Sequence, residues 1–349
     1  MARRLTTLLV ATGLLTATLG MASPDQAADA GRHRKLDVAT YNVYQGTDLT
    51  TLVAAPNLPE LVRRAGIAYG QVVATDFPSR AQAIARLIKK ERPEVIGLQE
   101  VALWRTGPLG GDLTTTYDFL AILLDALHAE GLDYRADAVD TTFSGTLPIS
   151  ATRQASFTDR DVILVREGVR TVHAESHRYA AKLVVPTPFG ITFTIPRGWS
   201  SVDVNLPGGP VRVANTHLEP VAPPIRNAQA QELHTVLEQS PYPVTAVGDF
   251  NSLPTDTTGP YGTFTGGGYV DAWHAVEPGK SGFTTTQDPD LRNVPSKLSR
   301  RVDYVFHRAG RLAAVRAEVF GDKLTDRTPN GLWPSDHAGL AVRLRGARR

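Results

Sequence analysis

The stretch PVTAVGDFN, residues 243–251, is a short apolar run that ends in polar residues. Its first part, Pro243–Val247, is typical of a buried strand that enters a loop. The loop opens with Gly248, Asp249 and Asn251. Because loops at the ends of buried strands present functional side chains from a rigid scaffold, this stretch predicts a strand that carries a functional site at its carboxyl end.

Other segments along the chain have the same layout. They are TYN (Thr40–Asn42), LQE (Leu98–Glu100), NTHLE (Asn215–Glu219) and SDH (Ser335–His337). A further segment, RVDYVF (Arg301–Phe306), holds Asp303 inside an otherwise apolar strand. Taken singly, each has an ordinary structural explanation, such as an Asx-turn at Asp249 or a satisfied core histidine at His217. Taken together, they predict several strand ends that meet at one cleft.

Between these segments, helical and strand patterns alternate. Helices are expected over Asn57–Gln71, Ser79–Arg92, Thr116–Glu130 and Arg226–Glu238, with a short one near Asp271–Ala275, and strands run from Leu36–Tyr41 to Ala338–Leu344. No internal repeat, low-complexity linker or sharp composition boundary divides the chain. The pattern favours a single α/β (α+β) domain with mixed or antiparallel sheets.

The composition excludes several classes of protein. The 349 residues are 42% hydrophobic with a net charge of +2, so the chain can bury enough apolar surface to fold. Without cysteine, it can form no disulfide scaffold, zinc–thiolate site, iron–sulfur cluster or cysteine nucleophile. The nearly balanced charge provides no bulk field for a polyanion, so binding to nucleic acid would depend on local patches.

The first thirty residues have the layout of a secretory signal. Arg3 and Arg4 precede the uncharged stretch Leu5–Leu19, and Ala28–Ala30 (ADA) offers a cleavage site. The run is shorter than the roughly 20 residues that span a bilayer. We therefore expect a signal peptide at residues 1–30, a catalytic domain at residues 31–349, and a secreted, extracellular product with no transmembrane segment in its mature chain.

Asp303 is the residue whose position most needs an explanation. A carboxylate among Val302, Tyr304 and Val305 is costly to bury without a partner. His337 is the natural candidate, because a buried aspartate can fix the tautomer of an imidazole and raise its basicity. Asp303 and His337 are thus expected to form a pair.

The remaining polar residues of these segments are mostly carboxylates and amides. Such oxygen ligands suit Mg²⁺, Mn²⁺ or Ca²⁺ rather than soft metals. No serine nucleophile is evident, and the two histidines could act on a proton or an oxyanion. This set of groups suits hydrolysis of a phosphoester by a metal-activated water.

In this order, the segments resemble those of the endonuclease/exonuclease/phosphatase superfamily, and the match runs from TYN at residue 40 to SDHAGL at residues 335–340. The resemblance implies two packed mixed β-sheets flanked by helices, a four-layer sandwich. It also implies an Mg²⁺-dependent hydrolase whose partner is its phosphoester substrate, with no stable protein partner.

The resemblance assigns the metal-binding residues one by one. It makes Glu100 the principal ligand of the divalent cation, with Asn42 helping to hold the metal or the phosphate. Asp336 would approach the metal or its water.

It also assigns the catalytic residues. His217 would contact the phosphate or protonate the leaving group, and Asp249 would position or deprotonate the attacking water. Asn251 would stabilise charge on the phosphorus oxygens. His337, oriented by Asp303, would be the catalytic histidine.

Two regions depart from the family pattern or stand apart from it. An extra helix, Asn57–Gln71, lies between the first motif and the helix before LQE. The segment Leu183–Trp199 is unusually apolar. It could be a lipid-facing hairpin or an ordinary buried hairpin, and we favour the buried one.

In the strand around Phe157–Arg166, Arg160 and Asp161 are expected to reach the cleft.

Alternatives to a secreted phosphoesterase come from other classes. A binding protein that kept the fold and lost activity would usually lack one of these acidic or histidine residues, and all are present. A serine hydrolase is disfavoured because the sequence contains no Gly-x-Ser-x-Gly elbow. Nuclease, sphingomyelinase or phospholipase C, and small-molecule phosphatase all stay open as the activity.

Overall fold

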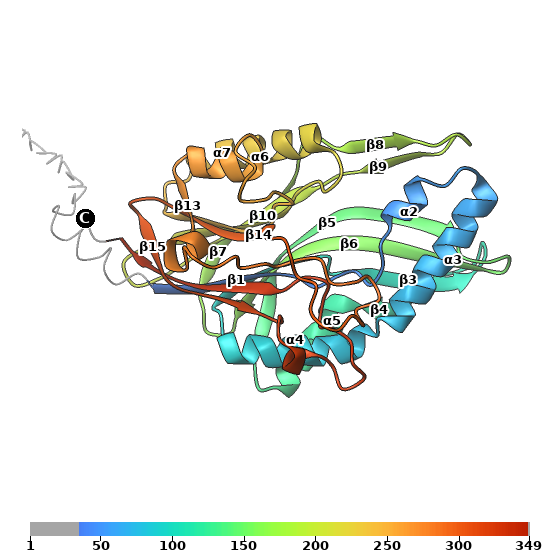
Figure 1. Cartoon of the computed structure of the whole chain (residues 1–349), viewed down its shortest axis with the longest axis horizontal. Coiled ribbons are helices and arrows are strands. Elements are labelled where there is room, and N and C mark those ends of the chain that lie inside the picture. Colours follow the sequence, from blue (N-terminus) through green and yellow to red (C-terminus); the bar gives the residue numbers. More distant parts are fainter. Residues whose placement is uncertain (1–34, 348–349) are drawn as a thin grey trace, which may run out of the picture.

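The computed structural model describes residues 35–347, which build two β-sheets packed face to face (Figure 1). The larger sheet has the order β15-β16-β1-β2-β6-β3-β4, with β5 also paired to β6. Its strands are β1 (Lys35–Asn42), β2 (Val95–Gln99), β3 (Leu103–Pro108), β4 (Thr114–Asp118), β5 (Tyr134–Pro148), β6 (Arg153–Arg166), β15 (Leu312–Phe320) and β16 (Gly339–Gly346).

The second sheet has the order β13-β14-β12-β11-β10-β7, and a separate hairpin pairs β8 with β9. These strands are β7 (Thr171–Arg178), β8 (Leu183–Pro186), β9 (Thr192–Ile195), β10 (Gly198–Val204), β11 (Val211–His217), β12 (Val244–Asp249), β13 (Tyr269–Asp271) and β14 (Asp303–Arg308).

Some of the helices cover the two outer faces. The helices are α2 (Thr50–Val53), α3 (Leu58–Ala74), α4 (Phe77–Glu91), α5 (Phe119–Ala129), α6 (Pro223–Glu238), α7 (Pro260–Gly266) and α8 (Ala272–Val276), with a short 3₁₀ helix η1 (Leu324–Asp326). In Figure 1, α4 and α5 lie below the larger sheet, whereas α6 and α7 lie above the second.

Three apolar clusters hold these layers together. Val38 and Val165 meet Val213 and Val247 between the sheets. The outer clusters pack Ile84 and Phe119 against the larger sheet, and Leu233 and Phe264 against the second. The central strands are buried on one face by the other sheet and on the opposite face by helices, so a four-layer sandwich results. The predicted fold class is confirmed.

One feature of the topology places the site. Each sheet contains a parallel pair, β1 with β2 and β11 with β12. Parallel strands bring their carboxyl ends to the same edge. Since Gln99 Nε2 donates to Asn215 Oδ1 at 2.7 Å, the two edges lie against each other across the sandwich. All four strand ends therefore meet at one place.

Helix boundaries differ from the expected ones in a few places. The helix expected over Thr116–Glu130 begins only at Phe119, because the β-branched run before it forms β4 against β3. Asp118 then caps the helix through its carboxylate. Helix α7 was not expected, since its Gly- and Pro-containing sequence is typical of a loop.

The apolar segment Leu183–Trp199 forms the expected hairpin, but the preference for burial was wrong. Strands β8 and β9 pair only with each other among the described strands, and Val184 is 50% exposed. In Figure 1, the hairpin extends beyond the strands of the second sheet, toward the end of the molecule that carries α2 and α3. The residues of its other face, Val184, Pro186, Thr192 and Thr194, are exposed, so the hairpin is not buried on both sides.

The expected signal peptide at residues 1–30 lies outside the described residues. Between residues 35 and 347, no helix is long and apolar enough to cross a membrane.

Candidate active site

The polar residues at the four strand ends contact one another. Asn42, the last residue of β1, donates through Nδ2 to Glu100 Oε1 at 3.0 Å and to Asp249 Oδ2 at 3.3 Å. His217, the last residue of β11, has its Nε2 3.6 Å from the same Asp249 oxygen. The carboxamide of Asn42 thus links a carboxylate from each sheet, at the base of a cleft.

The backbone is shaped to aim these side chains. Gly248 has φ +145°, and a Cβ there would lie 2.0 Å from the carbonyl oxygen of Thr216, so only glycine fits. Glu100 and Asn251 both adopt left-handed conformations, with φ of +60° and +49°. Positive φ is uncommon for such residues and is frequent at functional sites. The strands therefore turn sharply at the site.

Asp303 and His337 form the expected pair. His337 Nδ1 lies 2.9 Å from Asp303 Oδ2, and Asp303 stands opposite Asp249 in the β12–β14 register. His337 Nε2 lies 3.0 Å from Thr285 Oγ1 and 3.9 Å from Asp249 Oδ2. One imidazole therefore joins the carboxylates of two adjacent strands.

The other two predicted residues complete the arrangement. Asn251 donates from its backbone N–H to Asp249 Oδ1 at 2.9 Å and from its side chain to the carbonyl of Leu218 at 2.9 Å. Asp336 lines the same cavity as Glu100 and His337. All eight predicted site residues thus come from strand ends that converge here. Asp303 contacts His337 and does not itself line the cavity.

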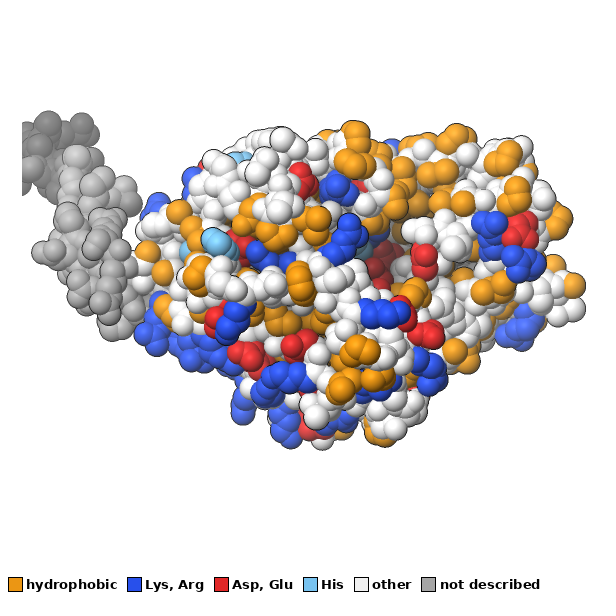
Figure 2. Space-filling view, viewed as in Figure 1, with side chains coloured by type: hydrophobic (Ala, Val, Ile, Leu, Met, Phe, Trp, Pro, Cys, Tyr) orange, Lys and Arg blue, Asp and Glu red, His pale blue; other side chains and the backbone are white. Residues whose placement is uncertain are grey.

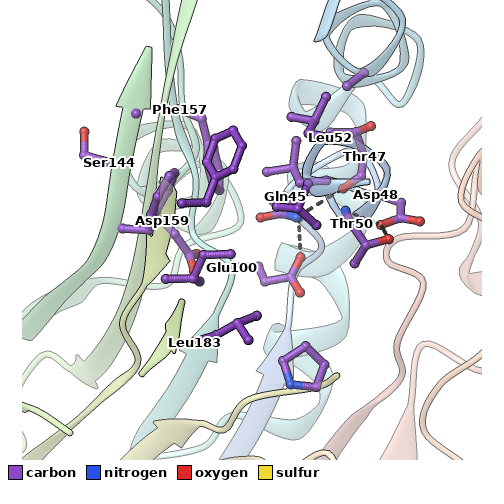
Figure 3. Close-up of a pocket in the computed structure, with 18 of the residues that line it drawn as sticks. Gln45, Thr47, Asp48, Thr50, Leu52, Glu100, Ser144, Phe157, Asp159 and Leu183 are labelled. Atoms are coloured by element: carbon purple, nitrogen blue, oxygen red, sulfur yellow. Dashed lines mark hydrogen bonds between the residues drawn. The ribbon is translucent and has the colours of Figure 1, made fainter. Parts of the chain in front are cut away.

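A cavity of about 760 Å³ opens over this group. In Figure 3, Phe157 and Asp159 extend from one wall, Gln45 and Leu52 extend from the facing wall, and Glu100 lies between them. Glu100 Oε2 accepts the backbone N–H of Gln45 at 2.9 Å. A volume of this size is in the range of small-molecule sites.

The carboxylates in the cleft crowd one another. Burial raises the pKa of Glu100, and the neighbouring Asp159 adds to the shift. Burial also raises the pKa of Asp336 to about 6, with the charge of Glu100 contributing. Grouped acids with raised pKa values are relieved by a bound cation. The carboxylate oxygens of Glu100 and Asp336 therefore fit a hard divalent metal. Asn42 Oδ1 already accepts the backbone N–H of Tyr44 at 3.0 Å, and Asn42 acts on the carboxylates through its Nδ2.

A second group of potential metal ligands lies beside the first. Within residues 35–347, Asp249, Asp303 and His337 each place a potential ligand atom within 4.8 Å of the others. The His337 nitrogen that faces Asp303 is already hydrogen-bonded, however, so this cluster is better suited to proton chemistry. Burial raises the pKa of Asp249 to about 7, reinforced by the charge of Asp303.

The two histidines have opposite tendencies. Burial disfavours charge on His337, but Asp303 and Asp336 outweigh it and raise its pKa well above the ordinary value. The pKa of His217 is instead lowered well below its ordinary value by burial and then by the charges of Arg197 and His337. These shifts favour the cationic form of His337 and the neutral form of His217.

Arg197 is a site residue that the sequence analysis did not find. Its Nη1 lies 3.0 Å from His217 Nδ1 and 3.4 Å from Asp159 Oδ2. Because a guanidinium has no acceptor, His217 Nδ1 must accept, and the ring proton sits on Nε2, facing Asp249. Arg197 lies in the apolar segment just before β10, where no local pattern marks it.

The expectation for the β6 strand was wrong in detail. Asp159, not Arg160 or Asp161, lines the cavity. Arg160 turns to the opposite face, where it pairs with Asp118 at 2.6 Å, and Asp161 is fully buried. Strand alternation separates Arg160 from its neighbours, and the facing sheet then covers Asp161.

Arg80 of α4 ties together the loops that carry the first and last motifs. It is fully buried and donates to the carbonyls of Val43, Tyr44, Thr75 and Pro334 at 2.7–3.0 Å. The loop after Asn42 and the loop before Asp336 are thereby held in fixed positions. Helical periodicity alone could not distinguish Arg80 from a solvent-exposed arginine.

The endonuclease/exonuclease/phosphatase family model matches residues 39–337, which include every predicted site residue. The chain belongs to this family. Among proteins with curated descriptions, no match is found.

Solved structures share the fold at low sequence identity. A family member from Bacteroides vulgatus is 16% identical, with a TM-score of 0.57, and covers 90% of this chain and 100% of its own. One from Bacteroides thetaiotaomicron is 20% identical, with a TM-score of 0.55, covering 90% and 96%. A humanized TDP2 from D. rerio is 15% identical, with a TM-score of 0.54, covering 89% and 99%. The fold class is thus that of this family.

Proposed function

We propose that this protein is a divalent-metal-dependent phosphoester hydrolase that promotes in-line attack of water on phosphorus. The observation that carries the proposal is the convergence at one cleft of Asn42, Glu100, Asp249 and His337, from four segments far apart in the chain. Membership of the family supports hydrolysis of phosphoesters. The hydrogen bonds from Asn42 to Glu100 and Asp249 support a preorganised site.

Glu100 and Asp336 would hold the metal, with Asn42 positioning Glu100, and Mg²⁺ is the first choice because the donors are carboxylate oxygens. Mn²⁺ or Ca²⁺ could replace it. When bound, the cation would neutralise charge on the phosphate and on the crowded carboxylates.

Asp249 would act on the attacking water. A general base works best when its pKa lies near the operating pH, and the pKa of Asp249 is raised to about 7 by burial and by Asp303. Its Oδ1 is held by the N–H of Asn251, so Oδ2 is the oxygen that faces the cleft. The proton of the water would go to that oxygen.

The histidines would act on the phosphate oxygens. Cationic His337, oriented by Asp303, would stabilise negative charge as it develops. Neutral His217 would donate through Nε2–H, because Arg197 occupies its other nitrogen. This favours phosphate contact over protonation of the leaving group for His217.

A substrate panel tests the proposal. The protein is assayed with Mg²⁺ on plasmid DNA, RNA, sphingomyelin, phosphatidylcholine, inositol phosphates and a chromogenic phosphodiester. We expect hydrolysis of at least one of them that is lost with EDTA, restored by Mg²⁺ and absent in His337→Ala. No metal-dependent hydrolysis across the panel would instead favour a binding protein that kept the fold without activity.

We also propose that the protein is exported. The basic residues Arg3 and Arg4, the uncharged stretch Leu5–Leu19 and the small residues that follow support this. Expression with and without residues 1–30, followed by fractionation of cells and medium, tests it: export should require those residues, and equal distribution of both forms would contradict it.

A further inference from the structure

The cavity over the catalytic residues has two chemically different parts. Its base carries Glu100, His217, Asp249 and His337, whereas much of the remaining lining is apolar. Phe143 and Leu147 of β5 contribute to this apolar part, as do Leu49 and Leu52 around α2. The catalytic groups therefore open directly onto an apolar surface.

The β8–β9 hairpin supplies a further apolar wall of the cavity. Leu183 pairs with Ile195 and Val185 with Phe193, so all four side chains share one face of the hairpin. Leu183, Phe193 and Ile195 line the cavity, and all four residues are only partly exposed. Figure 2 shows hydrophobic side chains gathered over this hairpin, beside a hollow with acidic side chains.

The charges of the lining do not suit a polyanion. Among the lining residues, Arg197 is the one Lys or Arg, and it is already engaged with Asp159 and His217. Six lining residues are acidic: Asp48, Glu100, Asp159, Glu219, Asp249 and Asp336. Nucleic-acid binding depends on Lys and Arg contacts with successive phosphates. This cavity has groups that can bind one phosphate at its bottom, and its walls have no free Lys or Arg for further phosphates.

Resting on the proposed function, we propose that the substrate is a single amphiphilic molecule: a phosphoester whose phosphate lies at the catalytic residues and whose alkyl or aryl chain lies between the β8–β9 hairpin and β5. This inference depends on the direct continuity between the apolar wall and the catalytic residues at the bottom of the cavity. Water adds to phosphorus and the ester oxygen leaves as an alcohol, so the reaction yields a phosphate product and an alcohol, one of which bears the apolar chain.

Two homologous series test the proposal on the full chain with Mg²⁺. One contains p-nitrophenyl alkyl phosphodiesters and the other alkyl phosphate monoesters, each with methyl, butyl and octyl chains below micelle-forming concentrations. If the chain is buried, kcat/KM should rise about two- to fourfold per methylene. The octyl ester would then exceed the methyl ester by at least about a hundredfold.

Variants locate the chain on the hairpin. Phe193→Ser should lower the octyl-to-methyl ratio of kcat/KM by about tenfold. Val184→Ser is the matched control, because Val184 lies in the same hairpin and does not line the cavity; its ratio should stay within about twofold of the wild-type value. Val221→Ser, in the loop after β11, provides a second test if Phe193→Ser fails to fold, since Val221 lines the cavity and is 57% exposed.

The experiments distinguish a failure of the amphiphilic-substrate inference from a failure of the proposed function. Metal-dependent hydrolysis with equal kcat/KM across chain lengths would overturn the amphiphilic substrate and leave the proposed function intact. Plasmid DNA cleaved with a higher kcat/KM than either octyl ester would also overturn it. Hydrolysis of a substrate in the panel with none in either series would overturn this inference alone. No metal-dependent hydrolysis in either series or anywhere in the panel would overturn the proposed function, and this inference with it.

Discussion

His337 Nδ1 lies 2.9 Å from Asp303 Oδ2, and both side chains are buried, although 34 positions separate them in the chain. Asp303 begins β14 and faces Asp249 across the strand pair, so the pair stands beside the carboxylate proposed to accept a proton. This arrangement allows one imidazole to keep a positive charge next to a carboxylate that can be neutral. Under the proposed function, the group that stabilises charge and the group that accepts the proton of the water would lie 3.9 Å apart.

Replacing Asp303 with Asn should reduce kcat by about two orders of magnitude or more, because the imidazole loses its orientation and its charge partner. The alkaline limb of the pH profile should move to lower pH, since the carboxylate that raises the pKa of His337 is gone. Steady-state kinetics across pH measures both effects. Asp140→Asn, another buried aspartate outside the cavity lining, is the control, and unchanged kcat in Asp303→Asn would limit Asp303 to a structural role.

Glu100→Gln should make the metal-free protein more stable while weakening its response to Mg²⁺. The substitution removes one of the crowded carboxylates whose pKa is raised by burial and by Asp159, so the metal-free state loses repulsion. The Tm should rise without metal, and the increase on adding Mg²⁺ should shrink. Thermal unfolding with EDTA and with Mg²⁺ measures this; an undiminished Mg²⁺ response would show that Glu100 is not a ligand.

Arg80→Met should destabilise the protein by about 3 kcal/mol, because it leaves buried carbonyls of Val43 and Pro334, among others, without donors. Urea unfolding checks the change. Arg86→Met, an exposed position on the same helix, should shift stability by no more than about 0.5 kcal/mol. A loss of similar size in both variants would mean that Arg80 matters only for helix formation.

Asp140 should make stability fall as the pH rises from about 4 to about 6. Burial raises the pKa of Asp140 to about 6 in the folded protein, although Arg178 opposes the shift and Asp159 adds to it. Between the unfolded and folded pKa values, the folded protein keeps the proton that the unfolded chain has lost, so stability declines with pH. Asp140→Asn should therefore gain about 1–2 kcal/mol over the wild type at pH 7 and almost nothing at pH 4. Urea unfolding at the two pH values decides it, and an equal difference at both would contradict the prediction.

The fold class and the candidate site were both accessible from local sequence. Strand patterns end in TYN, LQE, NTHLE, GDFN and SDH, and the chemistry of those residues does not depend on their neighbours in space. The Asp303–His337 pair was also predictable, because a carboxylate in an apolar strand needs a partner. The same logic failed for Arg160 and Asp161, where the choice between cleft and core depends on how β6 lies against the other sheet.

By itself, the sequence determined which chemical groups stand at the strand ends, because alternation, turns and residue type are local properties. Only the tertiary structure decided that Arg197 holds the tautomer of His217, that Arg80 joins two distant loops, and that the β8–β9 hairpin is an open wall of the cavity. Each of these depends on contacts between segments far apart in the chain. Such contacts arise from sheet pairing and layer packing, which leave no periodic signal in any single segment.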